Sequence, residues 1–394
     1  MTEETNESLV GGYAGRLLGI VSVGWLTFQG GRLLLPPLLP QIIETLEVTP
    51  FAAGVGISTL WGCYALLQYP SGRLSDRLSR KTLLVAGLGF GAAGFALLST
   101  AVVYPVFLFA AAVVGVGSGL YPTAARALIS DHFEEKRAAA FGLHIASGDL
   151  GGGVAAGAAV VVLAVATWQS AFLPVAALLG AVALAVHLHA REPYEVRSVD
   201  LDVRGATRRV AAQRRLRWLI LAYMGFAFSW QATAGFLPTF LQVSKGLSPA
   251  LASTGFASLF VVGAAVKPVA GRVGDGRRKP LVAAGVLGFG ALGLLALLLV
   301  EGTVPVLAAT VAYAVGLMGY PPVMQSYLMD VFPESSRGAD LGYVRTLYIG
   351  VGAVGPAYVG FVAGRASYVA AFASIVCLIA VSASIIAWRS LAGD

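Results

Sequence analysis

Twelve long apolar runs constrain the fold of this chain more than any other feature. Each holds 18 or more predominantly apolar residues, enough for a helix to cross a hydrocarbon core of about 30 Å. The runs cover residues 15–41, 51–71, 82–103, 105–130, 138–164, 169–190, 216–242, 249–269, 281–300, 304–329, 338–364 and 367–389. A mean hydropathy of +0.78 is too high for a soluble globular protein with a charged surface. The sequence therefore predicts an all-α membrane protein with twelve transmembrane helices.

A charged turn that occurs twice divides the chain into two similar halves. The first copy, GRLSDRLSRK, begins at Gly72, and the second, GRVGDGRRK, begins 199 positions later at Gly271. Other pairs keep nearly the same offset, including Tyr121-Pro122 with Tyr320-Pro321. The repeat predicts two pseudo-symmetric six-helix bundles, at residues 1–190 and 216–394, joined by a linker at residues 191–215.

The formal net charge of +7 indicates the orientation of the chain in a membrane and not an affinity for nucleic acid. Of the 27 Lys and Arg residues, 19 fall in loops after runs 2, 4, 6, 8 and 10, all on one side. Because positively charged loops face the cytoplasm, we expect a multi-pass cell-membrane protein with both termini in the cytoplasm. The arginine-rich linker is expected to be a partly helical tether beside anionic lipid headgroups.

The two charged turns resemble the loops between helices 2 and 3 and between helices 8 and 9 of the major facilitator superfamily of secondary transporters. The repeat extends this resemblance over essentially the whole chain. It implies that two bundles rock around a substrate site at their interface, near the middle of the membrane. We expect residues of the turns to act in gating, with the glycines allowing close helix approach: Gly72, Asp76, Arg77, Gly271 and Asp275.

Five ionisable side chains within the apolar runs are candidates for function, because a charge inside a membrane helix costs about 2.5 to 3.5 kcal/mol on insertion scales. They are Arg32, Arg126, Asp149, Lys267 and Arg345. Four cations against one carboxylate favour a pathway for an anion. Arg32 is the leading substrate-binding candidate, with a permanent salt bridge to Asp149 as the structural alternative. Asp149 is the candidate for proton coupling, unless it belongs to such a fixed pair.

Lys267 stands directly before the segment PVAG that leads into the second charged turn. This arrangement resembles helix 8 of nitrate/nitrite porters and oxalate-type carriers, in which a basic residue at this place binds the anion. Nitrate porters carry a matching arginine in helix 2, but the equivalent position here is Gln68. The resemblance therefore implies a small carboxylate or other organic anion and not nitrate, with Lys267 as a ligand. The alternative for Lys267 is a side chain that extends to the cytoplasmic interface.

Arg126 and Arg345 lie nearer the predicted cytoplasmic ends of their helices. We expect them to form gate salt bridges with Asp131, Asp330 or Asp340, with substrate contact as the second interpretation. Polar and aromatic residues at mid-span are expected to line the substrate cavity or, alternatively, to anchor the helices at the membrane interface. Those assigned to the cavity are Gln29, Trp230, Gln231, Tyr320 and Gln325.

Signals of an enzyme are absent from the sequence. It has no phosphate-binding Gly-Lys-Ser/Thr loop, no nucleophile elbow and no metal-spaced set among four histidines and two cysteines. We therefore expect no catalytic residues, cofactor or metal. The interpretation that results is a monomeric secondary transporter for a small organic anion, coupled to protons or another ion. The rival is a proton-coupled efflux carrier for amphipathic or cationic compounds, which requires a cavity of neutral or negative potential.

Overall fold

The computed structural model describes residues 8–75, 78–195, 202–275, 278–332 and 337–391, and these residues form helices joined by short connections. The described part of the chain contains twelve spans long and apolar enough to cross a membrane, as predicted. The helices of the first half are α1 (Gly12–Thr45), α2 (Pro50–Leu66), α3 (Gln68–Ser75), α4 (Arg80–Ser99), α5 (Tyr104–His132), α6 (Arg137–Val165), the 3-10 turn η1 (Trp168–Ala171) and α7 (Phe172–His189). After α8 (Val203–Ala212) come α9 (Arg214–Val243), α10 (Pro249–Asp275), α11 (Lys279–Leu299), α12 (Thr303–Val331), α13 (Arg337–Ala353), α14 (Gly355–Arg365) and α15 (Tyr368–Leu391).

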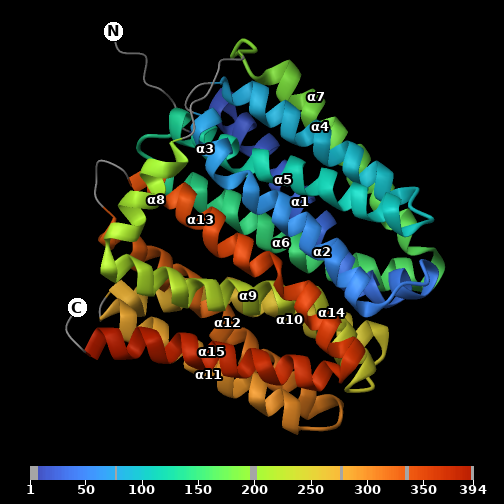
Figure 1. Ribbon diagram of the computed structural model, residues 1–394. Coiled ribbons are helices and arrows are strands. Elements are labelled where there is room, and N and C mark those ends of the chain that lie inside the picture. Colours follow the sequence, from blue (N-terminus) through green and yellow to red (C-terminus); the bar gives the residue numbers. More distant parts are fainter. Residues whose placement is uncertain (1–7, 76–77, 196–201, 276–277, 333–336, 392–394) are drawn as a thin grey trace.

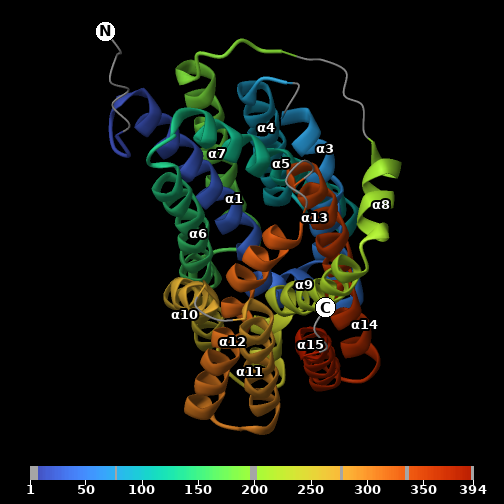
Figure 2. The same cartoon turned by 90° about the vertical axis from the view of Figure 1, so that its left-hand side faces the viewer.

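The two halves are six-helix bundles that lie side by side (Figure 1). Equivalent helices pack in the same way in each half: α4 lies against α5 and α7, and α11 lies against α12 and α15. Between the halves, α2 packs against α13 and α14, α6 packs against α10, and α1 packs against α9. Figure 2 views the molecule from the left-hand side of Figure 1, the side at which α1 begins and α15 ends, here called the terminus-bearing end.

Backbone contacts that only glycine permits recur in both halves at the repeat spacing. A Cβ atom added at Gly117 in α5 would lie 2.4 Å from the Gly91 nitrogen in α4. The equivalent Cβ at Gly316 in α12 would lie 2.2 Å from the Gly290 nitrogen in α11. Small residues are the usual means by which membrane helices approach closely, because lipid supplies no hydrophobic drive between helices. The sequence repeat is therefore also a repeat of packing.

Ion pairs near the charged turns show the same symmetry. Arg80 Nε lies 3.0 Å from Asp131 Oδ2, and Lys279 Nζ lies 2.6 Å from Asp330 Oδ2, again 199 positions apart. These pairs tie α4 to α5 and α11 to α12. Each therefore acts within one half and does not cross between the halves.

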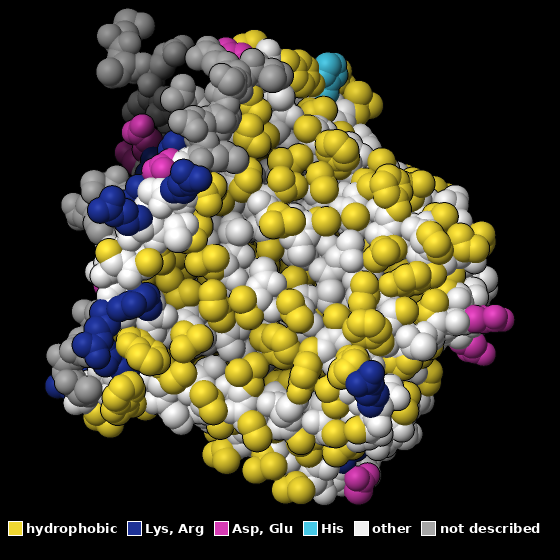
Figure 3. Space-filling view, in the orientation of Figure 1, with side chains coloured by type: hydrophobic (Ala, Val, Ile, Leu, Met, Phe, Trp, Pro, Cys, Tyr) yellow, Lys and Arg dark blue, Asp and Glu magenta, His cyan; other side chains and the backbone are white. Residues whose placement is uncertain are grey.

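The surface shows the charge asymmetry expected of a membrane protein. In Figure 3, Lys and Arg side chains gather on the left, at the terminus-bearing end, while hydrophobic side chains cover the middle. Acidic side chains lie at the right-hand edge of this view and also among the basic ones at the upper left, and one basic side chain lies toward the lower right. The distribution agrees with basic loops gathered on one side of a membrane.

The turn glycines do not have the packing role that was expected of them. A Cβ atom at Gly72 or Gly271 would have no other atom within 4 Å, so the prediction of close helix approach there is wrong for this structure. Asp275 is exposed at the end of α10. Asp76 and Arg77 lie outside the described residues.

At the end opposite the termini, the two halves touch through their backbones. A Cβ at Gly54 in α2 would lie 2.4 Å from the Pro356 carbonyl oxygen, and one at Gly360 in α14 would lie 2.2 Å from the Pro50 carbonyl oxygen. The Ala357 backbone N–H also donates a hydrogen bond to the Ser58 hydroxyl, at 3.0 Å. These glycines hold α2 and α14 together at this end.

Replacing Gly360 by alanine should therefore separate α2 from α14 and lower the stability of this arrangement by about 1 to 3 kcal/mol, as overpacking does. Thermal unfolding of the purified protein measures the change. Gly364→Ala on the same helix is the control, since a Cβ there meets nothing within 4 Å. The control should be neutral or slightly stabilising. Equal midpoints for the two variants would show that the close contact is unimportant.

Candidate functional site

A cavity of about 210 Å³ lies between the halves, with walls from α1, α2, α9 and α13. Most of its lining is aromatic, and its polar groups come mainly from α1 and α9: Gln29, Arg32 and Gln231. Both halves thus contribute to one central space. The rings that line it are Trp25, Trp61, Tyr64, Tyr223, Phe226, Trp230 and Tyr348.

Arg32 lies in an aromatic box at this cavity. Its guanidinium carbon lies 5.5 Å from the ring centre of Trp25, 4.9 Å from that of Trp61 and 4.8 Å from that of Tyr64. The side chain is 4% exposed, and Nη2 donates a hydrogen bond to Oε1 of Gln29. Nε and Nη1 have no hydrogen-bond partner. Cation–π contacts offset part of the desolvation of this charge, but two buried donors stay unsatisfied.

Two further arginines interact with Tyr64. Arg345 of α13 is within hydrogen-bonding reach of the Tyr64 hydroxyl, and Arg126 of α5 is in electrostatic contact with both Tyr64 and Arg345. Both arginines are half-buried. Among the ion pairs between described residues, none involves Arg32, Arg126 or Arg345. Three cations from three helices therefore interact with one tyrosine, and none of them has a carboxylate partner among the described residues.

The gate salt bridges that Arg126 and Arg345 were expected to form with Asp131 and Asp330 are not formed. Asp131 and Asp330 pair with Arg80 and Lys279 instead, because those residues begin the helices that pack beside the two aspartates. The side chain of Asp340 lies outside the described residues.

Lys267 and Asp149 form an ion pair between the halves. Lys267 Nζ in α10 lies 2.7 Å from each carboxylate oxygen of Asp149 in α6. About a quarter of each side chain is exposed, at 28% for Lys267 and 24% for Asp149. The pair faces a second cavity of about 500 Å³ between α6 and α10, which is otherwise lined by apolar residues and glycines.

The ion pair of Lys267 and Asp149 lies outside the central cavity that Arg32 lines. Neither residue lines the central cavity, so the structure does not bring Lys267 to the predicted substrate site with Arg32. The alternative pair of Arg32 with Asp149 is also not formed, because Asp149 is occupied by Lys267. Phe260, which lines the second cavity, contacts the ring of Trp230, which lines the first. The two cavities are thus neighbours with an aromatic wall between them.

The remaining expected cavity residues divide into two groups. Gln29, Trp230 and Gln231 line the cavity, and the Gln231 amide nitrogen donates to the Ile349 carbonyl at 3.2 Å. Tyr320 is fully buried behind the lining, against Tyr223 and Phe226, and is not part of the wall.

Gln325 in α12 is exposed and does not line the central cavity. It stands 199 positions after Arg126, so it is the counterpart of Arg126 in the second half. The repeat therefore places a cation at this position in one half and a neutral amide at the same position in the other.

Sequence reasoning missed the tyrosines of the site. Tyr64 and Tyr348 lie at mid-span, and Tyr64 lies under the Arg32 guanidinium, within hydrogen-bonding reach of Arg345 and in electrostatic interaction with Arg126. A mid-span tyrosine in an apolar helix needs a partner for its hydroxyl, and that requirement is the signal that could have identified them. Within the described residues, no group of three or more His, Cys, Asp or Glu side chains could hold a metal ion.

The fold and its central cavity define a membrane carrier built from two six-helix halves. Comparison with known families agrees: the model of the Major Facilitator Superfamily matches residues 20–275 and again residues 219–392. The chain belongs to the Major Facilitator Superfamily, as the charged turns predicted.

Individual relatives are more distant. Over 256 residues the chain is 27% identical to the probable sulfoacetate transporter SauU of Cupriavidus necator. The match spans 58% of this chain and 57% of that protein, so it covers little more than half of the relative's length. Crystal structures of a bacterial homologue of the human lysosomal transporter Spinster, inward-facing and either unoccupied or occupied, match with a TM-score of 0.80 at 17% identity. That match covers 96% of this chain and 97% of the other, and it shows a shared fold.

Proposed function

We propose that this protein is a secondary transporter that moves a small organic anion across the cell membrane by alternating access. The observation that carries the proposal is the arrangement of Arg32, Arg126 and Arg345 around Tyr64, with none of them in an ion pair among the described residues. Arg32 is buried and Arg126 and Arg345 are half-buried, and cations removed from water without counter-ions are unfavourable unless an anionic ligand completes them. An anion bound beside these arginines would supply the missing counter-charge.

The substrate class that fits best is a dianion with two anionic groups a few bonds apart. Arg32 lies over the Tyr64 ring, and both Arg32 and Arg345 are within hydrogen-bonding reach of Tyr64. Arg126 and Arg345 lie beyond the lining of the central cavity, so an occupant with one anionic group on Arg32 and a second that extends past Tyr64 toward Arg345 and Arg126 would give all three cations an anionic partner. Sulfoacetate, which names the relative in Cupriavidus necator, carries a sulfonate and a carboxylate and belongs to this chemical class. Guanidinium groups bind both kinds of oxyanion through two parallel hydrogen bonds.

The alternative function, efflux of amphipathic or cationic compounds, fits the site less well. The aromatic lining could hold such compounds, but the only charged side chain that lines the central cavity, within the described residues, is the buried cation Arg32. A cationic compound would have to enter beside that charge in a low-dielectric space.

We place the coupling function at the pair of Asp149 and Lys267. The pair joins α6 of one half to α10 of the other, where movement of the halves would break it. A proton on Asp149 would remove the charge that holds Lys267 and so favour separation. The basic loops support a topology with both termini in the cytoplasm. Both halves of this chain line the central cavity, which supports a site formed within a monomer.

Replacing Arg345 by glutamine should lower the affinity for sulfoacetate about 10- to 100-fold, because a charge-assisted hydrogen bond is lost. The affinity for acetate, which has a single anionic group, should change little. Arg126→Gln should act in the same direction. Calorimetric titration of the purified carrier measures both affinities. Arg365→Gln, at the far end of α14, is the control. Equal losses for acetate and sulfoacetate would contradict the dianion assignment, whereas binding of neither anion by the unmodified protein would contradict anion transport itself.

A further inference from the structure

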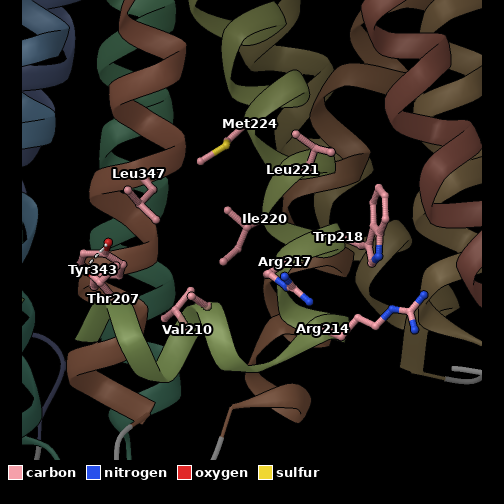
Figure 4. Close-up of a pocket in the computed structure, with 11 residues that line it drawn as sticks. Thr207, Val210, Arg214, Arg217, Trp218, Ile220, Leu221, Met224, Tyr343 and Leu347 are labelled. Carbon is pink, nitrogen blue, oxygen red and sulfur yellow. Dashed lines mark hydrogen bonds between the residues drawn. The ribbon is translucent and has the colours of Figure 1, made fainter. Parts of the chain in front are cut away.

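A separate groove of about 480 Å³ lies at the terminus-bearing end, between the linker helix α8 and the helices α9 and α13 (Figure 4). Its inner wall is apolar, formed by Val210, Ile220, Leu221, Met224 and Leu347. In Figure 4, Arg214, Arg217 and Trp218 lie together on one side of the groove, and Thr207 and Tyr343 lie on the other. The groove has no role in the proposed transport site.

The positions of these residues along α9 match the layers of a membrane. The apolar span of this helix begins at Leu216, between Arg214 and Arg217. Both arginines therefore lie at the depth of lipid headgroups, while Ile220 and Met224 lie one to two turns deeper. Trp218 contacts the ring of Trp388 edge-on at 6.1 Å, as expected of tryptophans at the membrane interface.

The described lining of the groove carries positive charge and contains no acidic residue that could balance it. None of the described residues that line it is acidic, and neither Arg214 nor Arg217 forms an ion pair with a described residue. Two exposed guanidinium groups above an apolar slot complement a molecule with an anionic head and an apolar tail.

The wall formed by α8 connects the two halves of the carrier. The Tyr69 hydroxyl of α3 donates a hydrogen bond to the Asp202 carbonyl at the start of α8, at 3.1 Å. At the other side, the hydroxyls of Thr207 in α8 and Tyr343 in α13 are hydrogen-bonded at 2.8 Å. An occupant of the groove would support α8 in this position, where it bridges α3 of the first half and α13 of the second.

We propose that this groove binds one anionic phospholipid of the adjacent leaflet, with its phosphate on Arg214 and Arg217 and an acyl chain along Ile220, Met224 and Leu347. Because the lipid supports the bridging position of α8, it stabilises the arrangement of the two halves seen here. The inference concerns a regulatory site and does not depend on which substrate the carrier moves.

The test is thermal unfolding of the detergent-solubilised protein with added phosphatidylglycerol, phosphatidylcholine or inorganic phosphate. A ligand that binds only the folded state raises the midpoint. We expect phosphatidylglycerol alone to raise it, by about 3 °C or more. The double variant R214Q/R217Q should lose this shift. R208Q, which removes an exposed charge of α8 outside the groove lining, should keep it.

A second variant distinguishes loss of lipid binding from a general loss of protein stability. Met224→Trp fills the apolar slot but leaves both arginines, so it should also lose the phosphatidylglycerol shift. The proposal is overturned if Met224→Trp or R214Q/R217Q keeps the full shift, or if R208Q loses as much as the double variant. An equal response to phosphatidylcholine overturns the requirement for an anionic head, and an equal response to inorganic phosphate overturns the requirement for a lipid.

Discussion

Replacing Arg32 by methionine should abolish anion binding and leave the empty carrier at least as stable as before. The guanidinium is buried, has two unsatisfied nitrogens and forms no ion pair with a described residue. Loss of a buried charged partner weakens binding by about 2 to 5 kcal/mol, which corresponds to roughly 30-fold or more. Because an uncompensated buried charge is itself destabilising, an apolar side chain of similar size should not lower the unfolding midpoint.

The measurement is thermal unfolding with and without sulfoacetate or malonate. Unmodified protein should be stabilised by the anions, and Arg32→Met should not be. Arg16→Met serves as the control, since Arg16 is an exposed cation on the same helix. If Arg32→Met markedly destabilises the empty protein and retains anion stabilisation, then Arg32 is a structural residue and the site lies elsewhere.

Replacing Asp149 by asparagine should uncouple transport from the proton gradient without removing substrate binding. Asp149 lies outside the central cavity, so its loss leaves the arginines around Tyr64 in place. Lys267 would lose its partner, which should lower stability by about 1 to 3 kcal/mol, less than for a fully buried pair because both side chains are partly exposed. Proteoliposomes made with this variant should exchange substrate across the membrane but fail to accumulate it against a gradient.

The double variant D149N/K267Q separates coupling from stability. It removes both charges, so it should recover most of the stability that D149N loses. It should still fail to accumulate substrate, since no carboxylate is left to carry a proton. Full proton-driven accumulation by the double variant would show that the pair is a structural tie between α6 and α10 and nothing more.

The fold was predictable because hydrophobic length and internal repetition are properties of the sequence alone. Twelve apolar runs and an offset of 199 positions were enough to predict the two bundles. The breaks in two spans were not predicted. Span 2 divides near Leu67 and span 11 near Val354, where local geometry interrupts the helix without a signal in hydropathy.

The site was predictable only in part, because pairing depends on which face of a helix meets which neighbour. Gly148 and Gly151 pack against Trp25 and Leu26 of α1. Asp149 is rotated by about 100° from Gly148 around the helix, and this rotation directs it to α10 and to Lys267. Sequence spacing alone offered only Arg32 as a partner for Asp149 and did not predict the ion pair with Lys267.

Uptake of labelled sulfoacetate into proteoliposomes tests most directly whether this protein transports an anion. Uptake should be saturable, other small dianions should inhibit it, and Arg32→Met should abolish it. Transport of a lipophilic cation, with no uptake of sulfoacetate and no inhibition by any small organic anion, would contradict anion transport.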